Sequence, residues 1–197
     1  MNNIVGNVYD KYNSKNPITR LLMRGFLSSI TELYNFIEPA SVLEVGCGEG
    51  ALANYLLQHS SKRPQCFEAS DLSLDVISVE SNPLIKFRES SIYELPYSEN
   101  SFDLVVCSEV LEHLESPQSG LAEIARVAEK GVLVSTPWEP VWRALNLIRG
   151  KYIRELGNTP GHIQHFSRQG LINLVQTHLK IAKKRTPLPW TILLGVP

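Results

Sequence analysis

The chain has no long hydrophobic run. No apolar stretch approaches the ~20 residues that a helix needs to cross a bilayer, and Met1 to Tyr12 are too polar for a secretory signal peptide. We therefore expect a cytoplasmic protein. An excess of either charge is also lacking, because 19 lysines and arginines face 20 aspartates and glutamates. The whole-chain field thus favours neither nucleic acid nor a membrane as partner, and a small molecule is expected.

Cysteine is scarce, and its pattern excludes two classes of small protein. Cys47, Cys66 and Cys107 are odd in number and widely spaced, so neither a disulfide framework nor a zinc site is expected. Internal repeats, low-complexity segments and linkers are lacking too. A length of 197 residues suits one domain of ordinary size. We expect residues 1–197 to form a single α/β domain.

The most informative stretch runs from Val42 to Leu57. The apolar run Val42 to Val45 predicts a buried strand, and the glycines at 46, 48 and 50 predict a tight turn into a helix that starts near Ala51. Glycine allows positive φ and lets a ligand approach main-chain N–H groups that a Cβ would shield. A strand, a glycine turn and a helix in this order are typical of a nucleotide-binding domain.

Glu44 indicates which nucleotide is bound. Gly46, Gly48 and Ala51 also satisfy a dinucleotide fingerprint, so the glycines alone leave a nicotinamide-dependent oxidoreductase open. A carboxylate two residues before Gly46 would repel a pyrophosphate and attract an ammonium group. S-adenosylmethionine is a nucleoside ligand that carries an amino acid and no phosphate. The sequence therefore favours S-adenosylmethionine over a dinucleotide.

The rest of the chain alternates predicted strands with helical patterns. Strands are expected to start near residues 41, 65, 84, 101 and 131, which predicts successive βα units and a parallel sheet. Asp71 ends the second of these strands at about the ~20-residue spacing where an acid binds ribose hydroxyls. Ser73 is expected to cap a helix that carries Leu74, Ile77 and Val79. Polar residues gather at the strands' carboxyl ends, where ligands bind such sheets.

At these motifs the sequence resembles the class I S-adenosylmethionine-dependent methyltransferases, in particular the type 11, ubiquinone-biosynthesis-like members, whose first motif is an acid followed by Gly-x-Gly-x-Gly. The resemblance implies a Rossmann-like three-layer αβα sandwich with a seven-stranded, mostly parallel sheet and a C-terminal antiparallel hairpin. It divides the domain into an N-terminal arm and helix, a cofactor-binding core, a substrate-side cover, and a last helix with a hairpin, over residues 1–38, 39–136, 137–166 and 167–197.

The resemblance also implies a set of cofactor-binding residues. They are Glu44, Gly46, Cys47, Gly48, Gly50, Asp71, Leu72, Ser91, Ile92 and Ser108. The family often has an aspartate where Ser91 stands, so here adenine recognition is expected to depend on Ile92 and stacking. An N-terminal arm folds over the cofactor in many members, which would give Tyr9, Tyr12, Arg20 or Arg24 the role of a lid.

The reaction implied is transfer of a methyl group to an unidentified small-molecule acceptor by in-line displacement, with O- and N-methylation both open. Alignment and exclusion of water are the main requirements, and a base helps if the acceptor is a hydroxyl or an amine. The candidate catalytic residues are His162, His113 and Glu109, with His165 as a further candidate. We favour His162, because Pro160-Gly161 predicts a turn that can present it to the strand ends.

Three alternatives remain at this point, and the first is the nicotinamide-dependent oxidoreductase. Glu109, Glu112 and His113 form an E-x-x-E-H pattern that, in one metal-assisted branch of the family, holds a divalent ion together with a later histidine. We expect no metal and a metal-free base. The chain could also be a module that binds S-adenosylmethionine without catalysis. Such a module would leave every acceptor unmethylated.

Overall fold

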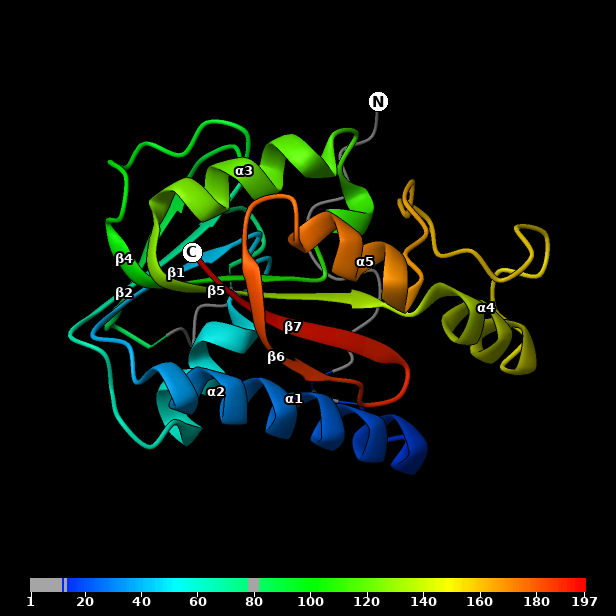
Figure 1. The fold of residues 1–197 in the computed structure, drawn as a ribbon. Coiled ribbons are helices and arrows are strands. Elements are labelled where there is room, and N and C mark those ends of the chain that lie inside the picture. The colour runs from blue at the N-terminus through cyan, green and yellow to red at the C-terminus, as the bar shows by residue number, and fades with distance from the viewer. Residues whose placement is uncertain (1–11, 13, 78–81) are drawn as a thin grey trace.

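A seven-stranded sheet forms the centre of the computed structural model, which describes residues 12, 14–77 and 82–197 (Figure 1). The strand order is β3-β2-β1-β4-β5-β7-β6. The first five of these strands run parallel, and β7 is antiparallel to both β5 and β6. The strands are β1 (Ser41–Val45), β2 (Cys66–Asp71), β3 (Ile85–Glu89), β4 (Phe102–Ser108), β5 (Ala128–Pro137), β6 (Lys180–Arg185) and β7 (Trp190–Val196).

Helices cover both faces of this sheet and make three layers (Figure 1). On one face, α1 (Pro17–Ile37) and α2 (Ala51–His59) bury an apolar cluster that includes Phe26 and Leu56. On the other face, α3 (Pro117–Val127) and α5 (Arg168–Val175) bury a second cluster that includes Leu121 and Leu171. The central parallel strands β1 and β4 are nearly continuous in burial, as expected for strands covered on both sides. The predicted fold class is confirmed.

Local sequence explains where these helices begin. Asn16 caps α1, because its Oδ1 accepts hydrogen bonds from the N–H groups of Ile18 and Thr19 at 2.9 and 3.2 Å, and Pro17 occupies the first helical position. Ser167 caps α5 in the same way through the N–H of Gly170 at 3.0 Å. These caps fix the ends of helices that lie beside the strands' carboxyl ends.

Two segments differ from the sequence-based expectation. The helix predicted after Ser73 is absent from residues 72–77, where Ser73 Oγ accepts from Asp75 N–H at 3.2 Å and forms a turn. Serine and aspartate compete with helical hydrogen bonds in this way. Val79 lies outside the described residues. Conversely, the predicted substrate-side cover, for which no helix is expected from the sequence, contains a regular helix, α4 (Glu139–Ile148), with Val141, Leu145 and Ile148.

Within the described ranges, no helix combines the length and the apolar character that crossing a membrane requires. The division of the chain into four functional parts remains a prediction. The segment after β5 nevertheless lies apart from the three layers of the fold. In Figure 1, α4 and the loop that follows it project beyond the sheet on the side of the carboxyl end of β5.

Candidate active site

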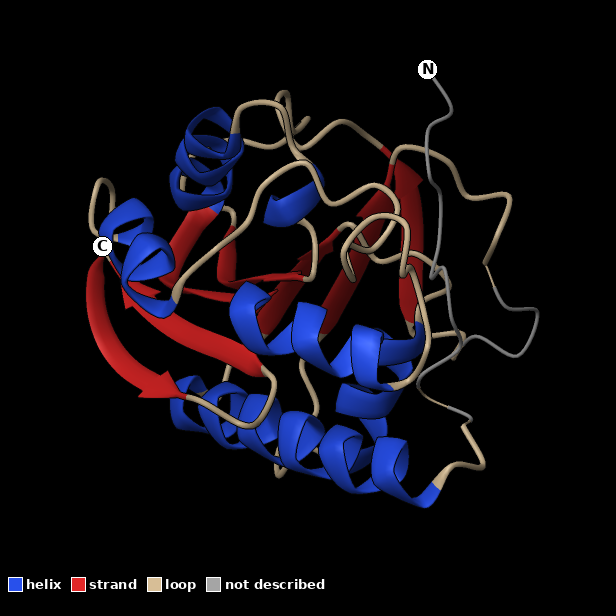
Figure 2. Ribbon diagram, turned by 90° about the vertical axis from the view of Figure 1, so that its right-hand side faces the viewer, coloured by secondary structure: helices blue, strands red, loops and turns tan. Residues whose placement is uncertain are grey.

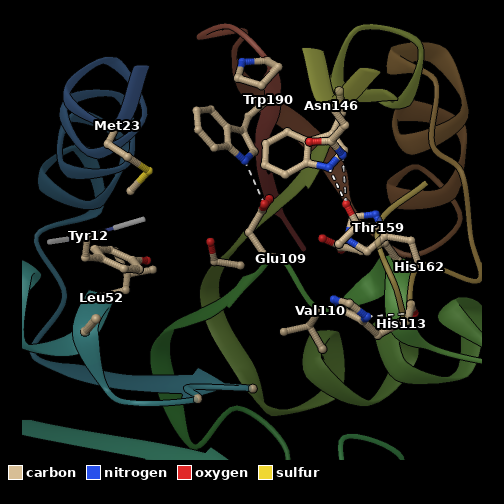
Figure 3. A pocket seen from close by; sticks show the side chains of 18 of the residues that line it. Tyr12, Met23, Leu52, Glu109, Val110, His113, Asn146, Thr159, His162 and Trp190 are labelled. Atoms are coloured by element: carbon tan, nitrogen blue, oxygen red, sulfur yellow. Dashed lines mark hydrogen bonds between the residues drawn. The ribbon is translucent and has the colours of Figure 1, made fainter. Parts of the chain in front are cut away.

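A cavity of about 600 Å³ lies at the carboxyl ends of β1, β2 and β4. Figure 3 shows Met23, Tyr12 and Leu52 on one side of it, and Asn146, Thr159, His162 and His113 on the other. Its volume falls in the range of pockets that enclose small molecules, roughly 300–1,000 Å³. The cavity joins the predicted cofactor residues to the predicted substrate-side cover.

The glycine turn forms the floor at the end of β1. Gly46 has a φ of +73°, and its N–H donates to Ser70 O at 2.7 Å. A Cβ at Gly46 would lie 2.3 Å from Cγ2 of Val110, so only glycine fits both the backbone and the space. Gly48 and Cys47 also line the cavity, whereas Gly50 caps α2 and packs against Phe87 outside it.

Glu44 is the buried acid of this floor, with 3% of its surface exposed. Its Oε2 has no hydrogen-bond partner among the described residues. Burial, with a smaller contribution from Asp71, raises the pKa of the Glu44 carboxyl to about 8. A cation placed in the cavity would supply the missing partner and favour the ionised form. This is the electrostatic environment expected of an ammonium site.

Asp71 lies beside the turn at the end of β2. Its Oδ2 accepts from the N–H of Gly48 at 2.7 Å, and its Oδ1 accepts from the N–H of Leu72 at 2.7 Å. The carboxylate therefore holds the glycine turn in place and also lines the cavity. Because each carboxylate oxygen can accept more than one hydrogen bond, both oxygens retain capacity for ligand hydroxyls. Leu72 lines the cavity as well, with 61% of its surface exposed.

The position of Ser91 differs from the one expected of a cofactor-binding residue. Ser91 does not line the cavity: its Oγ accepts from Tyr93 N–H at 3.2 Å and stabilises a turn. Ser90 and Ile92 line the cavity instead, and Ser90 Oγ is buried without a hydrogen-bond partner among the described residues. Of the two neighbouring serines, Ser90 and not Ser91 lines the cavity, and contact of either one with an adenine ring stays a prediction.

Glu109, which lines the cavity, connects the end of β4 to β5 and β7. It follows β4 with a φ of +61°, and its Oε2 accepts from the indole N–H of Trp190 at 2.7 Å (Figure 3). Its Oε1 accepts from Ser135 Oγ at 3.3 Å, and Ser108, which lines the cavity, is hydrogen-bonded to the same serine. These contacts assign Glu109 to holding β7 against β4. They leave its carboxylate poorly suited to act as a base.

His162 and His113 face each other across the cover side of the cavity. Their rings make an edge-to-face contact with centroids 4.9 Å apart. His162 Nδ1 lies 2.7 Å from Oε1 of Glu139, and only 7% of the His162 surface and 3% of the Glu139 surface are exposed. His113 Nδ1 lies 2.9 Å from the carbonyl oxygen of Gly161, which requires an N–H at that nitrogen. Each ring is oriented through Nδ1.

Glu139 was missed by the sequence reasoning, and His165 was placed too near the site. Glu139 follows the sheet as the first residue of α4, and no spacing pattern connects it to His162. His165 is exposed, does not line the cavity, and lies with Nε2 3.1 Å from Asn158 Oδ1. Among the lid candidates, Tyr12 lines the cavity and Tyr9 lies outside the described residues. Arg20 and Arg24 do not line it.

A potential metal-ligand group differs from the one considered from sequence. Glu112, His113 and His162 each offer a ligand atom, and these atoms lie within 4.8 Å of one another. Glu109 is not in this group, because its carboxylate is directed to Trp190. Both histidines have Nδ1 turned to the protein, so Nε2 would be the donor. The residues present therefore fit a divalent ion through Glu112 rather than Glu109.

The seven-stranded sheet, its flanking helices and its antiparallel C-terminal strands define the architecture as the Rossmann-like fold found in methyltransferases. Residues 43–135 match the family model described as a methyltransferase domain. Over this segment the chain is similar to S-adenosylmethionine-dependent methyltransferases, as the resemblance predicted, and neither the oxidoreductase nor the non-catalytic module is favoured.

Relatives and solved structures agree with this family. The ubiquinone biosynthesis O-methyltransferase of Rickettsia bellii (strain OSU 85-389) is 28% identical over 159 residues, which are 78% of this chain and 63% of that protein. The namesake from Hahella chejuensis is 36% identical over 94 residues, 46% of this chain and 39% of that protein. The chain thus spans less than two thirds of these relatives.

Two solved structures share the fold at low identity. The PH0226 protein of Pyrococcus horikoshii superposes with a TM-score of 0.69 at 16% identity and covers 96% of both chains. The magnesium protoporphyrin IX methyltransferase of Synechocystis, solved with S-adenosylhomocysteine, gives a TM-score of 0.67 at 17% identity over 93% of this chain and 89% of its own. At such identities the likeness establishes the fold.

Proposed function

We propose that the protein transfers the methyl group of S-adenosylmethionine to a hydroxyl of a small-molecule acceptor. The observation that carries this proposal is Glu44, a buried carboxyl with a raised pKa at the floor of the glycine-turn cavity. Its Oε2 has no hydrogen-bond partner in the part of the chain that the structure describes. An α-ammonium group supplies what this oxygen lacks. When bound, S-adenosylmethionine supplies an electrophilic methyl group that needs little covalent assistance.

The cofactor half is assigned to four elements of the cavity. Glu44 binds the ammonium group, the turn at Gly46 to Gly48 lies against the amino-acid part, and Asp71 accepts hydrogen bonds from ribose hydroxyls. Ser90 and Ile92 lie at the position of the adenine ring. Support comes from their common location along one side of the cavity at the ends of β1, β2 and β3. Tyr12 lies over this half, where burial and the carboxylates of Glu44 and Glu109 raise the pKa of its phenol above its usual range.

The acceptor half contains a base that is held in position. Glu139 accepts a hydrogen bond from His162 Nδ1–H, which leaves His162 Nε2 to take a proton from the acceptor. The buried carboxylate also stabilises the imidazolium that forms. A hydroxyl needs such a base, because its oxygen becomes strongly nucleophilic only as the proton leaves, whereas a neutral amine already has a free lone pair. The dyad therefore supports O-methylation.

A direct test combines binding and turnover. Calorimetric titration should give micromolar affinity for S-adenosylmethionine and S-adenosylhomocysteine, and no binding of NADH. Transfer of a labelled methyl group should then be screened against pools of phenols, hydroxy acids, amines, lipids and RNA. Labelling confined to hydroxyl compounds supports the proposal. Binding without transfer to any pool, or transfer to amines alone, contradicts it.

A further inference from the structure

Exposed apolar side chains concentrate around the mouth of the cavity. Ile148 is 80% exposed, Ile18 is 68% exposed and Ile163 is 52% exposed, and all three line the cavity. Further exposed aliphatic residues lie next to them in the chain. We define the mouth surface as the first turns of α1 (Ile18, Leu21), the end of α4 (Leu147, Ile148) and the following loop (Ile153, Leu156, Ile163). Figure 2 looks directly at this side of the molecule, with α4 above α1.

The end of α4 buries a polar side chain and exposes apolar ones. Asn146 is buried with 1% of its surface exposed, whereas the next two residues, Leu147 and Ile148, are exposed. The amide of Asn146 donates to the carbonyl of Gly157 at 2.9 Å and to Thr159 Oγ1 at 3.2 Å. These bonds fix the rotation of the helix and direct its aliphatic side chains outward. Clustered exposed apolar side chains of this kind are typical of a surface that contacts another protein or a membrane.

Positive charge accompanies the exposed aliphatic residues. Residues 14–24 and 143–163 together carry seven lysines and arginines and one acid, Glu155, in a chain whose formal net charge is −1. The remainder of the chain is therefore acidic, and the balanced total conceals a separation of charge along the sequence. The cations are Lys15, Arg20, Arg24, Arg143, Arg149, Lys151 and Arg154. Arg149 and Lys151 line the cavity mouth itself.

We propose that the mouth surface docks on a lipid bilayer that contains anionic lipids. Aliphatic side chains interspersed with lysine and arginine match the boundary between headgroups and acyl chains, because the former enter the apolar layer and the latter pair with lipid phosphates. Ile18, Ile148 and Ile163 belong both to this surface and to the cavity lining, so docking turns the cavity toward the lipid. The inference goes beyond methyl transfer and does not rest on it.

Vesicle sedimentation tests the proposal without any methyl acceptor. The protein should pellet with vesicles of phosphatidylcholine and phosphatidylserine, far less with phosphatidylcholine alone, and should be released by high salt. Arg20→Gln with Arg154→Gln should weaken binding about 10- to 30-fold, since each cation near an anionic surface contributes about fivefold or more. Ile148→Asn with Ile153→Asn should weaken binding to a similar extent at low salt.

Matched controls lie at the other end of the sheet. Leu84 is 55% exposed and directly precedes β3, and Lys180 pairs with Val196 where the parallel strands begin. Leu84→Asn and Lys180→Gln should bind vesicles like the wild type. Thermal midpoints and cofactor titration verify that each variant is folded. If the double variant Ile148→Asn with Ile153→Asn does not fold, Arg20→Gln alone tests the proposal.

Three outcomes overturn the proposal. Equal binding to both kinds of vesicle would remove the role of charge. Wild-type binding by the mouth-surface variants would place the contact elsewhere. Concentration-dependent dimerisation in sedimentation velocity that is lost in Ile148→Asn, without vesicle binding, would assign the mouth surface to a second copy of this chain.

Discussion

Glu139 and His162 lie 23 residues apart in the chain, yet their side chains meet at 2.7 Å between Oε1 and Nδ1 in a buried pair. α4 and the loop that follows lie between them in sequence, so the contact closes the whole cover segment. The pair gives the proposed base a fixed orientation. It also makes Glu139 a positioning residue, which acts on the acceptor through His162.

Glu139→Gln should lower kcat for methyl transfer about 10- to 100-fold and leave the dissociation constant of S-adenosylmethionine unchanged. The amide can still accept from His162 Nδ1–H but cannot stabilise the imidazolium, and a general base contributes about 10²- to 10⁴-fold. His162→Ala should lose the full contribution together with the acid limb of the pH–rate profile. Glu155→Gln, in the same segment but exposed, is the control. Equal losses in kcat and cofactor affinity for Glu139→Gln would instead indicate a purely structural pair.

Binding of S-adenosylmethionine should release a proton near pH 6.5. Glu44 has a pKa raised to about 8 in the free protein, so its carboxyl is mostly protonated there, and a bound ammonium favours the ionised form. Calorimetry in buffers of different ionisation enthalpy measures the released proton. Glu44→Gln should abolish the release and weaken binding by about 1–3 kcal/mol. Unchanged affinity in this variant would refute the ammonium site.

The same carboxyl predicts how stability of the free protein depends on pH. The pKa of the Glu44 carboxyl is higher in the folded than in the unfolded state. Its contribution to the free energy of unfolding is therefore fully present below about pH 4, the unfolded-state pKa. It is lost as the pH rises toward and through the folded-state value of about 8. Glu44→Gln should therefore raise the thermal midpoint of the free protein at pH 8, and should change it little at pH 4. A lower midpoint at pH 8 would show that the Glu44 carboxylate stabilises the free protein at that pH, which contradicts the raised pKa.

A chelator should leave the rate of methyl transfer unchanged, because the proposed base works without a metal. If Glu112, His113 and His162 hold a divalent ion, activity should vanish with the chelator and return with magnesium or manganese, since an ion lowers the pKa of the acceptor hydroxyl directly. Glu112→Gln separates the two mechanisms further. It should abolish a metal-dependent rate and spare a rate that depends only on His162 and Glu139.

Trp142→Ala should raise the Michaelis constant of the acceptor about 10-fold or more and leave cofactor affinity near the wild-type value. The indole lines the cover side of the cavity and donates to Thr159 Oγ1 at 2.8 Å, so its removal opens the acceptor half to water. Trp142→Phe keeps most of the ring and loses only the hydrogen bond, which makes it the matched comparison. Equal damage to acceptor and cofactor binding by Trp142→Ala would assign the residue to the core.

Local sequence signals predicted the fold, and they also predicted several residues that line one part of the cavity. The strand before Gly46, the glycine turn and the acid at Asp71 lie within one βαβ unit, so spacing along the chain determines their meeting in space. Glu44, Gly46, Gly48 and Asp71 do line the cavity, although their binding roles stay predictions. The sequence could not show that Ser90 lines the cavity and Ser91 does not, because a turn has no periodicity from which its register can be read.

The acceptor half could not be predicted in the same way. Glu109 contacts Trp190 across 81 residues, and Glu139 contacts His162 after a helix and a loop whose path no pattern fixes. The helix expected after Ser73 failed because an apolar spacing competed with the turn preference of serine and aspartate. The two missed contacts are tertiary and form only in the folded chain, whereas the missing helix reflects a competition between two local preferences.

The cover between Trp138 and Phe166 has its own internal fastening, with Asn146 bound to Gly157 and Thr159, and its two ends meet where Glu139 N–H donates to the carbonyl of Phe166 at 3.2 Å. A segment whose two ends lie next to each other can be replaced as a unit without moving the rest of the fold. Descendants of such a chain could acquire new acceptors by replacing this one contiguous stretch of gene, while the glycine turn and its cofactor pass through the exchange unaltered.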